Sequence, residues 1–158
     1  NPDNESFTKK SAGLQSELQK REIEVLKSRI ERHPKDLVLK FELGKRYRLI
    51  KKFTPAIKLL QQAIVDVRIA AEAHVLLGMC FMAEKKGSLA RRNLEKAVEK
   101  IDPNEQAKIF LLSHYWLGRL CEDAGQTVEA EDHYSEVLAI DYEYKDALQR
   151  LEKLQGGE

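Results

Sequence analysis

The sequence predicts an all-α fold built from repeated pairs of helices. Leu, Ala, Glu, Lys, Gln and Arg dominate nearly every segment, whereas Val, Ile, Thr, Tyr and Phe never form the alternating runs that mark strands. Charged residues make up 34% of the 158 residues, which is above the usual quarter and indicates amphipathic helices with solvated outer faces. A third observation, an internal period, indicates that the helices stack as an array.

The period is carried by positions that keep residue type and spacing. The first copy contains Leu43, Gly44, Tyr47, Ala56, Leu60 and Ala63. The second, 34 residues later, contains Leu77, Gly78, Phe81, Ala90, Leu94 and Ala97. The third, after a further 40 residues, contains Leu117, Gly118, Cys121, Ala130, Tyr134 and Val137. Each copy predicts two antiparallel helices, because the last three positions share one helical face and the glycine permits close backbone approach.

At these residues the chain resembles the tetratricopeptide-repeat family. The match covers residues 37–144 and is weaker in the third copy, where Cys121 and Val137 replace the family's aromatic residue and alanine. The resemblance implies an α-solenoid, a right-handed superhelix of helix pairs that stack because none can bury its apolar face alone. We expect an N-terminal amphipathic helix or degenerate half repeat, three repeats, and a C-terminal capping helix with a tail, at residues 1–36, 37–70, 71–104, 105–144 and 145–158.

The flanking and inserted segments are also predicted to be helical. Residues 8–32 carry apolar residues at helical spacing, and Asn1-Pro2-Asp3-Asn4 is interpreted as a turn before them. Asp102-Pro103-Asn104-Glu105 is a helix start, and no helix breaker follows until Gly125. The first helix of the third copy is therefore expected to be longer by almost two turns. On that extension, Ile109 and Phe110 either pack on the preceding repeat or form an exposed apolar patch.

Charge and cysteine content limit the classes of partner. The formal net charge is +1, but residues 1–100 hold 22 basic and 13 acidic side chains, and residues 101–158 hold 5 and 13. This asymmetry indicates either solvated faces that differ or a head-to-tail contact or charged partner. Cys80 and Cys121 lie in apolar helical patterns, which favours buried thiols and a cytoplasmic location over a disulfide framework.

The ends and the hydropathy of the sequence say little about targeting. The sequence contains no run of 18 apolar residues, the length that a membrane-spanning helix needs. Its polar N-terminal residues are unlike a signal peptide. The chain lacks an initiating Met, so we expect a fragment of a longer protein.

The sequence offers no catalytic, metal or cofactor motif. Its four histidines, two cysteines and paired carboxylates lack metal-ligand or acid–base spacing, and no phosphate-binding glycine loop is present. We therefore expect no enzyme activity, no metal and no cofactor. A basic run from Lys45 to Lys52 raises nucleic-acid binding as a hypothesis, although its cations occupy different helical faces without interleaved aromatic residues.

The resemblance implies a partner-binding groove on the concave side of the first helices. The positions it assigns to that groove are Phe41, Lys45, Arg48, Val75, Met79, Met82, Tyr115, Trp116 and Arg119. Leu76 and Leu112 also stand where the family's best-known peptide site has polar residues that clamp a C-terminal carboxylate, so the sequence does not favour a chaperone-tail binder. The alternatives are that Trp116 only fills a core position or that the residue 8–32 helix covers the groove.

Three functional hypotheses follow from these patterns. The first is a non-catalytic protein-interaction scaffold that holds a protein or peptide segment in the groove. The second is self-association, or a structural spacer within a larger repeat protein, through the charged ends or the residue 8–32 helix. The third is nucleic-acid binding through the Lys45–Lys52 run.

Overall fold

A computed structural model of the chain describes residues 2–156. Asn1 and residues 157–158, which belong to the predicted N-terminal turn and C-terminal tail, lie outside the described residues. The described part contains helices and no strand. In chain order the helices are α1 (Pro2–Arg32), α2 (Leu37–Leu49), α3 (Phe53–Ala63), α4 (Ala70–Ala83), α5 (Gly87–Lys100), α6 (Ala107–Asp123), α7 (Thr127–Ile140) and α8 (Ala147–Leu154).

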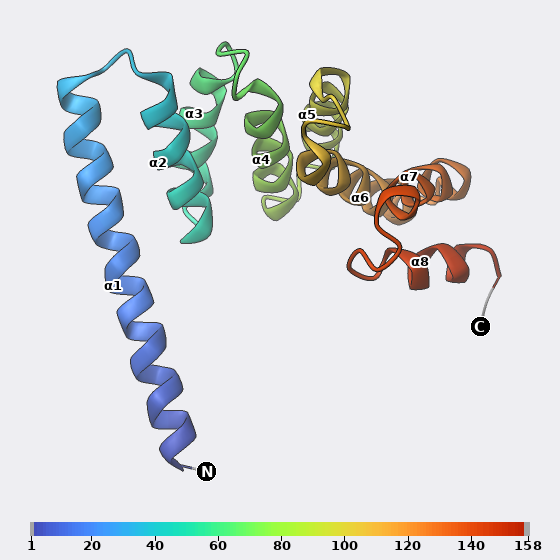
Figure 1. The fold of residues 1–158 in the computed structure, drawn as a ribbon, viewed down its shortest axis with the longest axis horizontal. Helices are drawn as coiled ribbons and strands as arrows, with labels where there is room; N and C mark the ends of the chain where they lie inside the picture. The colour runs from blue at the N-terminus through green and yellow to red at the C-terminus, as the bar shows by residue number, and fades with distance from the viewer. Residues whose placement is uncertain (1, 157–158) are drawn as a thin grey trace. The chain divides into compact units, whose positions relative to one another are not determined.

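The chain divides into two compact units, residues 1–63 and 64–158. In the first unit α2 packs on α3, and the C-terminal half of the long helix α1 packs on α2 (Figure 1). Ile23 is the buried residue of α1, and an ion pair of 2.9 Å joins Glu22 Oε2 to Arg46 Nε of α2. Residues 2–18 of α1 are all exposed.

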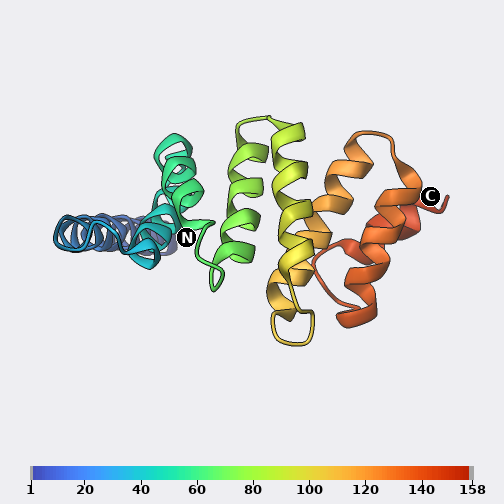
Figure 2. The same ribbon diagram turned by 90° about the horizontal axis from the view of Figure 1, so that it is seen from above.

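In the second unit α4 pairs with α5, α6 pairs with α7, and α8 packs on α7. Figure 2 shows α4 and α5 side by side. The α6–α8 core contains Tyr134, Val137 and Ala147, and Leu151 and Leu154 of α8 pack against it. The last helix thus covers apolar surface that α6 and α7 leave open.

The glycine of each helix pair lies where the two helices approach most closely. A Cβ atom at Gly78 would lie 2.7 Å from Leu94 Cγ, and one at Gly118 would lie 2.7 Å from Tyr134 Cε1. Both distances are shorter than any ordinary carbon–carbon contact. The Leu-Gly signature therefore sets the spacing within each pair, because the missing side chain makes room for the large residue of the second helix.

Two expectations about helix ends are wrong. Pro2, Asp3 and Asn4 belong to α1 and do not form a turn; proline is tolerated in a first helical turn, and Asp3 is stabilised there by the helix dipole. The first helix of the third copy begins at Ala107, so α6 has 17 residues against 14 in α4 and is less than one turn longer. The Asp102 carboxylate accepts a hydrogen bond from Asn104 N at 2.9 Å, which stabilises a turn over the preceding residues.

Candidate functional site

The structure places the nine predicted groove residues on α2, α4 and α6. Phe41, Val75 and Tyr115 are buried. The partly exposed members are Lys45, Arg48, Met79, Met82, Trp116 and Arg119. The three buried side chains contribute mainly to the interior of their own unit, so only the other six are accessible to a partner.

The α2 residues of this set belong to the first unit. The Lys45 ammonium lies 5.2 Å from the centre of the Phe41 ring and 3.6 Å from Glu42 Oε1. Arg46, in the same basic run, is paired with Glu22. Two cations of the Lys45–Lys52 run are therefore partly neutralised by neighbouring carboxylates, and Lys51 has a left-handed backbone conformation in the turn after α2, with φ 61°.

The α4 and α6 residues form a half-buried apolar surface within the second unit. It packs on the buried cluster of Val75, Leu94, Ala97 and Leu117. We call this surface the α4–α6 wall, and it consists of Met79, Met82, Ile109, Leu112 and Trp116. Each of its members is partly buried, so a ligand could cover the surface that remains exposed.

Trp116 is positioned in the α4–α6 wall by an aromatic contact and a cation–π contact. Its indole meets Tyr115 edge to face at 5.2 Å between centroids, and the Arg119 guanidinium lies 5.7 Å from the ring centre. Its Nε1 is buried and has no hydrogen-bond acceptor among the described residues. Packing and the cation–π contact, without a hydrogen bond from Nε1, therefore fix this side chain.

A cavity of about 330 Å³ opens beside the wall, between the N-terminal parts of α4 and α6. Val75, Leu76, Ile109 and Leu112 are among its lining residues. The charged residues that line it are Glu72, Glu105 and Lys108. The sequence pattern did not place these three at a site. For Glu105 the reason is that a helix was predicted over residues 102–106, where the structure forms a turn.

The predicted extension of α6 contributes to both packing and the site. Phe110 is buried and its ring lies 4.3 Å, centroid to centroid, from the imidazole of His114. Ile109 is half-buried and belongs to the α4–α6 wall. The two alternatives were packing within the fold and an exposed apolar patch. Phe110 packs within the fold. Ile109 packs on the core and also lines the cavity.

Tyr115 is engaged by the C-terminal helix. Its hydroxyl donates to Asp146 Oδ1 at 2.6 Å and accepts from Arg119 Nη1 at 3.3 Å. Arg150 of α8 donates to Asp146 Oδ2 at 2.9 Å and to Glu122 Oε2 at 3.0 Å. These hydrogen bonds join α6 to α8, so the hydroxyl of Tyr115 has a structural role in holding the two helices together.

His114 and His133 form a partly buried contact between α6 and α7. Their Nδ1 atoms lie 3.0 Å apart, so one ring donates to the other only while at least one of the two nitrogens is unprotonated. Burial, followed by the neighbouring His133, lowers the pKa of His114 to about 4. Burial also lowers the pKa of His133. Both rings are therefore neutral packing groups at pH 7.

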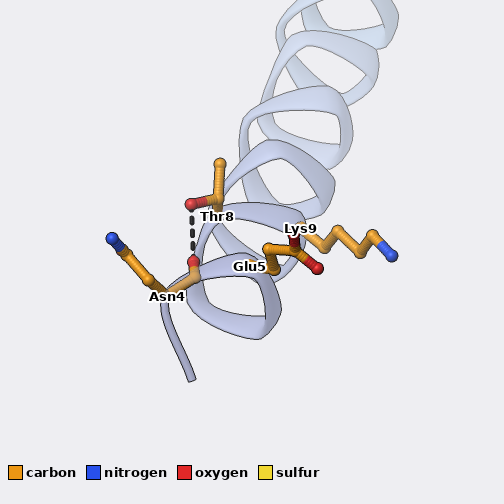
Figure 3. Close-up of a pocket in the computed structure, with 4 residues that line it drawn as sticks. All are labelled: Asn4, Glu5, Thr8 and Lys9. Atoms are coloured by element: carbon orange, nitrogen blue, oxygen red, sulfur yellow. Dashed lines mark hydrogen bonds between the residues drawn. The ribbon is translucent and has the colours of Figure 1, made fainter. Parts of the chain in front are cut away.

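Metal ligands, reactive thiols and further pockets were the other candidate sites in residues 2–156. No group of three or more His, Cys, Asp or Glu side chains in this range could hold a metal ion. Cys80 and Cys121 are buried cysteines, and burial raises the pKa of the Cys121 thiol. Figure 3 shows a hollow on the first turns of α1, lined by Asn4, Glu5, Thr8 and Lys9, where Thr8 Oγ1 donates to the Asn4 carbonyl at 2.7 Å. These side chains all come from one exposed helix, which offers no enclosing surface.

No helix in the described range combines the length and apolar character needed to cross a membrane.

Solved structures with the same helix-pair architecture are found, whereas no protein-family model matches the chain. A crystal structure of MamA is 23% identical, with a TM-score of 0.73 over 85% of this chain and 75% of that chain. TTC0263, a thermophilic TPR protein of Thermus thermophilus, is 18% identical, with a TM-score of 0.66 over 90% of this chain and 75% of that one.

This chain has the tetratricopeptide-repeat fold. A further structure with this fold, the first TPR of Spaghetti (RPAP3), is bound to the HSP90 peptide SRMEEVD. It is 17% identical, with a TM-score of 0.65 over 75% of this chain and 92% of that chain.

A curated relative is also similar in sequence to this tetratricopeptide-repeat chain. A probable UDP-N-acetylglucosamine–peptide N-acetylglucosaminyltransferase, SPINDLY of Arabidopsis thaliana, is 31% identical over 100 residues, or 63% of this chain. The chain spans only a tenth of the length of that protein.

Proposed function

We propose that this tetratricopeptide-repeat chain is a non-catalytic protein-interaction scaffold that binds an apolar segment of a partner protein on the α4–α6 wall. The observation that carries the proposal is the row of half-buried Met79, Met82, Leu112 and Trp116 beside an apolar cavity. Met side chains adapt to different partner shapes, and Trp is enriched among residues that dominate binding energy. The peptide complex of the Spaghetti repeat supports the general class of function.

The size of the cavity suits side chains of a partner. Its volume of about 330 Å³ lies at the lower end of the range of roughly 300–1,000 Å³ that small-molecule sites occupy. The wall continues from this cavity along α4 and α6, which gives an elongated apolar surface instead of a closed chamber. Such a surface fits an amphipathic helix whose apolar anchors are spaced by three or four residues.

The charges argue against an acidic peptide such as SRMEEVD. That peptide carries three carboxylate side chains, and binding them in a partly desolvated groove requires paired cations. In the second unit, two carboxylates and one ammonium line the cavity, from Glu72, Glu105 and Lys108. The wall itself is apolar, with Arg119 at its edge. Placing further carboxylates there would bring like charges together. The proposed ligand is therefore an apolar segment that is neutral or basic.

Binding of an amphipathic Leu-rich helical peptide with Lys on its polar face tests the proposal. We expect saturable binding by isothermal titration calorimetry, and Leu112→Glu should weaken it at least tenfold because the carboxylate would be buried against apolar partner atoms. The matched control is Val128→Glu, which introduces the same charge at a side chain of α7 that is 70% exposed and outside the wall. Equal affinity of the two variants, with unchanged melting curves, would refute the proposed site.

A further inference from the structure

Helix α1 carries two separate apolar rows. The first, Ile23, Leu26 and Ile30, contains the buried residue of the helix and two partly buried ones. The second, which we call the exposed stripe, consists of Phe7, Leu14, Leu18 and Val25, exposed by 74%, 67%, 57% and 58%. Several large apolar side chains exposed on one face of a helix are unusual on a monomer and mark interaction surfaces.

The exposed stripe is straight and faces away from the packed row. At 100° per residue its four members lie within an arc of about 40°, and they span about 27 Å along the axis. The centre of the packed row lies roughly 130° around the helix. A second helix could therefore cover the exposed stripe without displacing α2.

The order of residues along the stripe is self-complementary. The apolar positions are spaced by seven, four and seven residues, which is the same in either direction. When two copies of α1 run antiparallel, Phe7 meets the partner's Val25 and Leu14 meets the partner's Leu18. Ser11 then meets the partner's Arg21, so polar residues also face polar residues. A twofold axis requires this kind of reciprocal pairing.

From this pattern we propose that two copies of the chain associate through the exposed stripe as an antiparallel two-helix coiled coil. Residues 4–31 cover four heptads, and the stripe occupies four of the eight a and d positions, which form the seam that coiled coils bury. The other four are polar: Asn4, Ser11, Arg21 and Ser28. Residues 2–18 have no buried side chain in the single chain, and a helical segment of that length is marginally stable alone. Pairing would bury its apolar face and stabilise it.

Charges favour the antiparallel over the parallel arrangement. In the antiparallel pair, Lys10 flanks the seam next to the partner's Glu24, and symmetry makes this attraction occur twice, against one Glu17 pair at the axis. In a parallel pair, Glu24 would lie beside the partner's Arg29 twice, but Glu17 would lie beside the partner's Glu22 twice and Arg21 would oppose the partner's Arg21 in the seam. Like charges at such positions destabilise a coiled coil.

A membrane surface fits the stripe less well than a second copy. Residues 2–32 contain seven basic and six acidic side chains, so α1 carries almost no net charge to attract anionic lipid. The near-neutral balance also distinguishes this interface from a head-to-tail contact between oppositely charged segments. A hydrophobic dimer should persist at 1 M salt, where electrostatic association is screened within about 3 Å.

The oligomeric state tests the proposal independently of the α4–α6 wall. Sedimentation equilibrium should show a concentration-dependent mass approaching twice 18.2 kDa in both low and high salt. The double variant Leu14→Glu with Leu18→Glu should remain a monomer. The matched control, Ser6→Glu with Ser16→Glu, adds the same charge to exposed positions of α1 outside the stripe and should still dimerise. A wild-type monomer at all concentrations, or a dimer unaffected by the stripe substitutions, would overturn the inference.

The orientation is tested by a spin label at Glu5→Cys. In the antiparallel dimer the two labelled positions lie about 33 Å apart along the axis, whereas in a parallel dimer they face each other across one helix diameter of about 10 Å. The wild-type chain, treated with the same spin label, is the control for reaction at the buried Cys80 and Cys121. A dipolar distance below about 20 Å would contradict the antiparallel arrangement.

Discussion

At the scale of single residues, the glycines of the helix pairs show how much the fold depends on an absent side chain. A Cβ at Gly118 would approach the Tyr134 ring, whose hydroxyl donates to Glu122 Oε2 at 2.6 Å. That hydrogen bond and the burial of the ring leave Tyr134 little room to move. Gly87, in contrast, is exposed at the start of α5, and a Cβ atom added there would meet open space.

Gly118→Ala should therefore destabilise the chain by about 1–3 kcal/mol, because the added methyl group forces the Tyr134 ring from its place. Gly87→Ala is the matched control, and it should cause no loss of stability and a gain of up to about 1 kcal/mol from helix propensity. Urea denaturation of both variants measures the difference. Equal stabilities would show that the close approach does not constrain the pair.

The sequence predicted this residue-scale packing well, because the Leu-Gly signature reports directly on close helix contact. It predicted the candidate site less completely. Met79, Met82 and Trp116 were assigned to the groove and lie on the α4–α6 wall, whereas Phe41, Val75 and Tyr115 are buried. Helical spacing identifies the face on which a residue lies, but the depth of burial depends on neighbouring helices. The contact of α8 with Tyr115 is such a case.

At the scale of helices, the turns and contacts between elements decide where sequence reasoning failed. The six additional residues before the third Leu-Gly pair were expected to lengthen one helix, but α6 takes only part of them. The Asp102 carboxylate accepts a hydrogen bond from the backbone N–H of Asn104, which favours a turn over a helix at this point. The residue types that usually start a helix do not reveal this competing hydrogen bond. This turn also shapes the candidate site, since it places Glu105 on the cavity.

The histidine contact between α6 and α7 predicts a loss of stability in acid. The folded state lowers the pKa of His114 to about 4 from an ordinary 6.5, so the unfolded chain binds more protons between these pH values. The contribution of His114 to the free energy of unfolding is fully present above pH 6.5 and is lost progressively as the pH decreases toward 4. The expected loss between pH 7.5 and 5.0 is about 2 kcal/mol from this group.

Urea denaturation at the two pH values checks this prediction. The charged groups near the pair include Arg91, which lowers the pKa of His133, and Glu95, which raises it. His114→Phe should remove about 2 kcal/mol of the pH dependence. A pH dependence that survives His114→Phe in full would contradict the assignment.

At the scale of the whole molecule, the chain carries two surfaces with different proposed tasks. The exposed stripe of α1 belongs to the first unit, and the α4–α6 wall belongs to the second. The helix-pair fold was predictable from one sequence because its period repeats three times. The stripe was visible only as part of an amphipathic helix, since the sequence alone does not show which of two apolar rows the fold covers.

The methionine methyl groups offer the most direct test of the proposed function. The chain contains two methionines, Met79 and Met82, and both lie on the α4–α6 wall. With methyl-labelled methionine, the spectrum of the chain should show two signals that shift together as the Lys/Leu amphipathic peptide is added. Neither should shift with SRMEEVD. Calorimetric binding of the amphipathic peptide while both methyl signals stay unmoved would contradict the account.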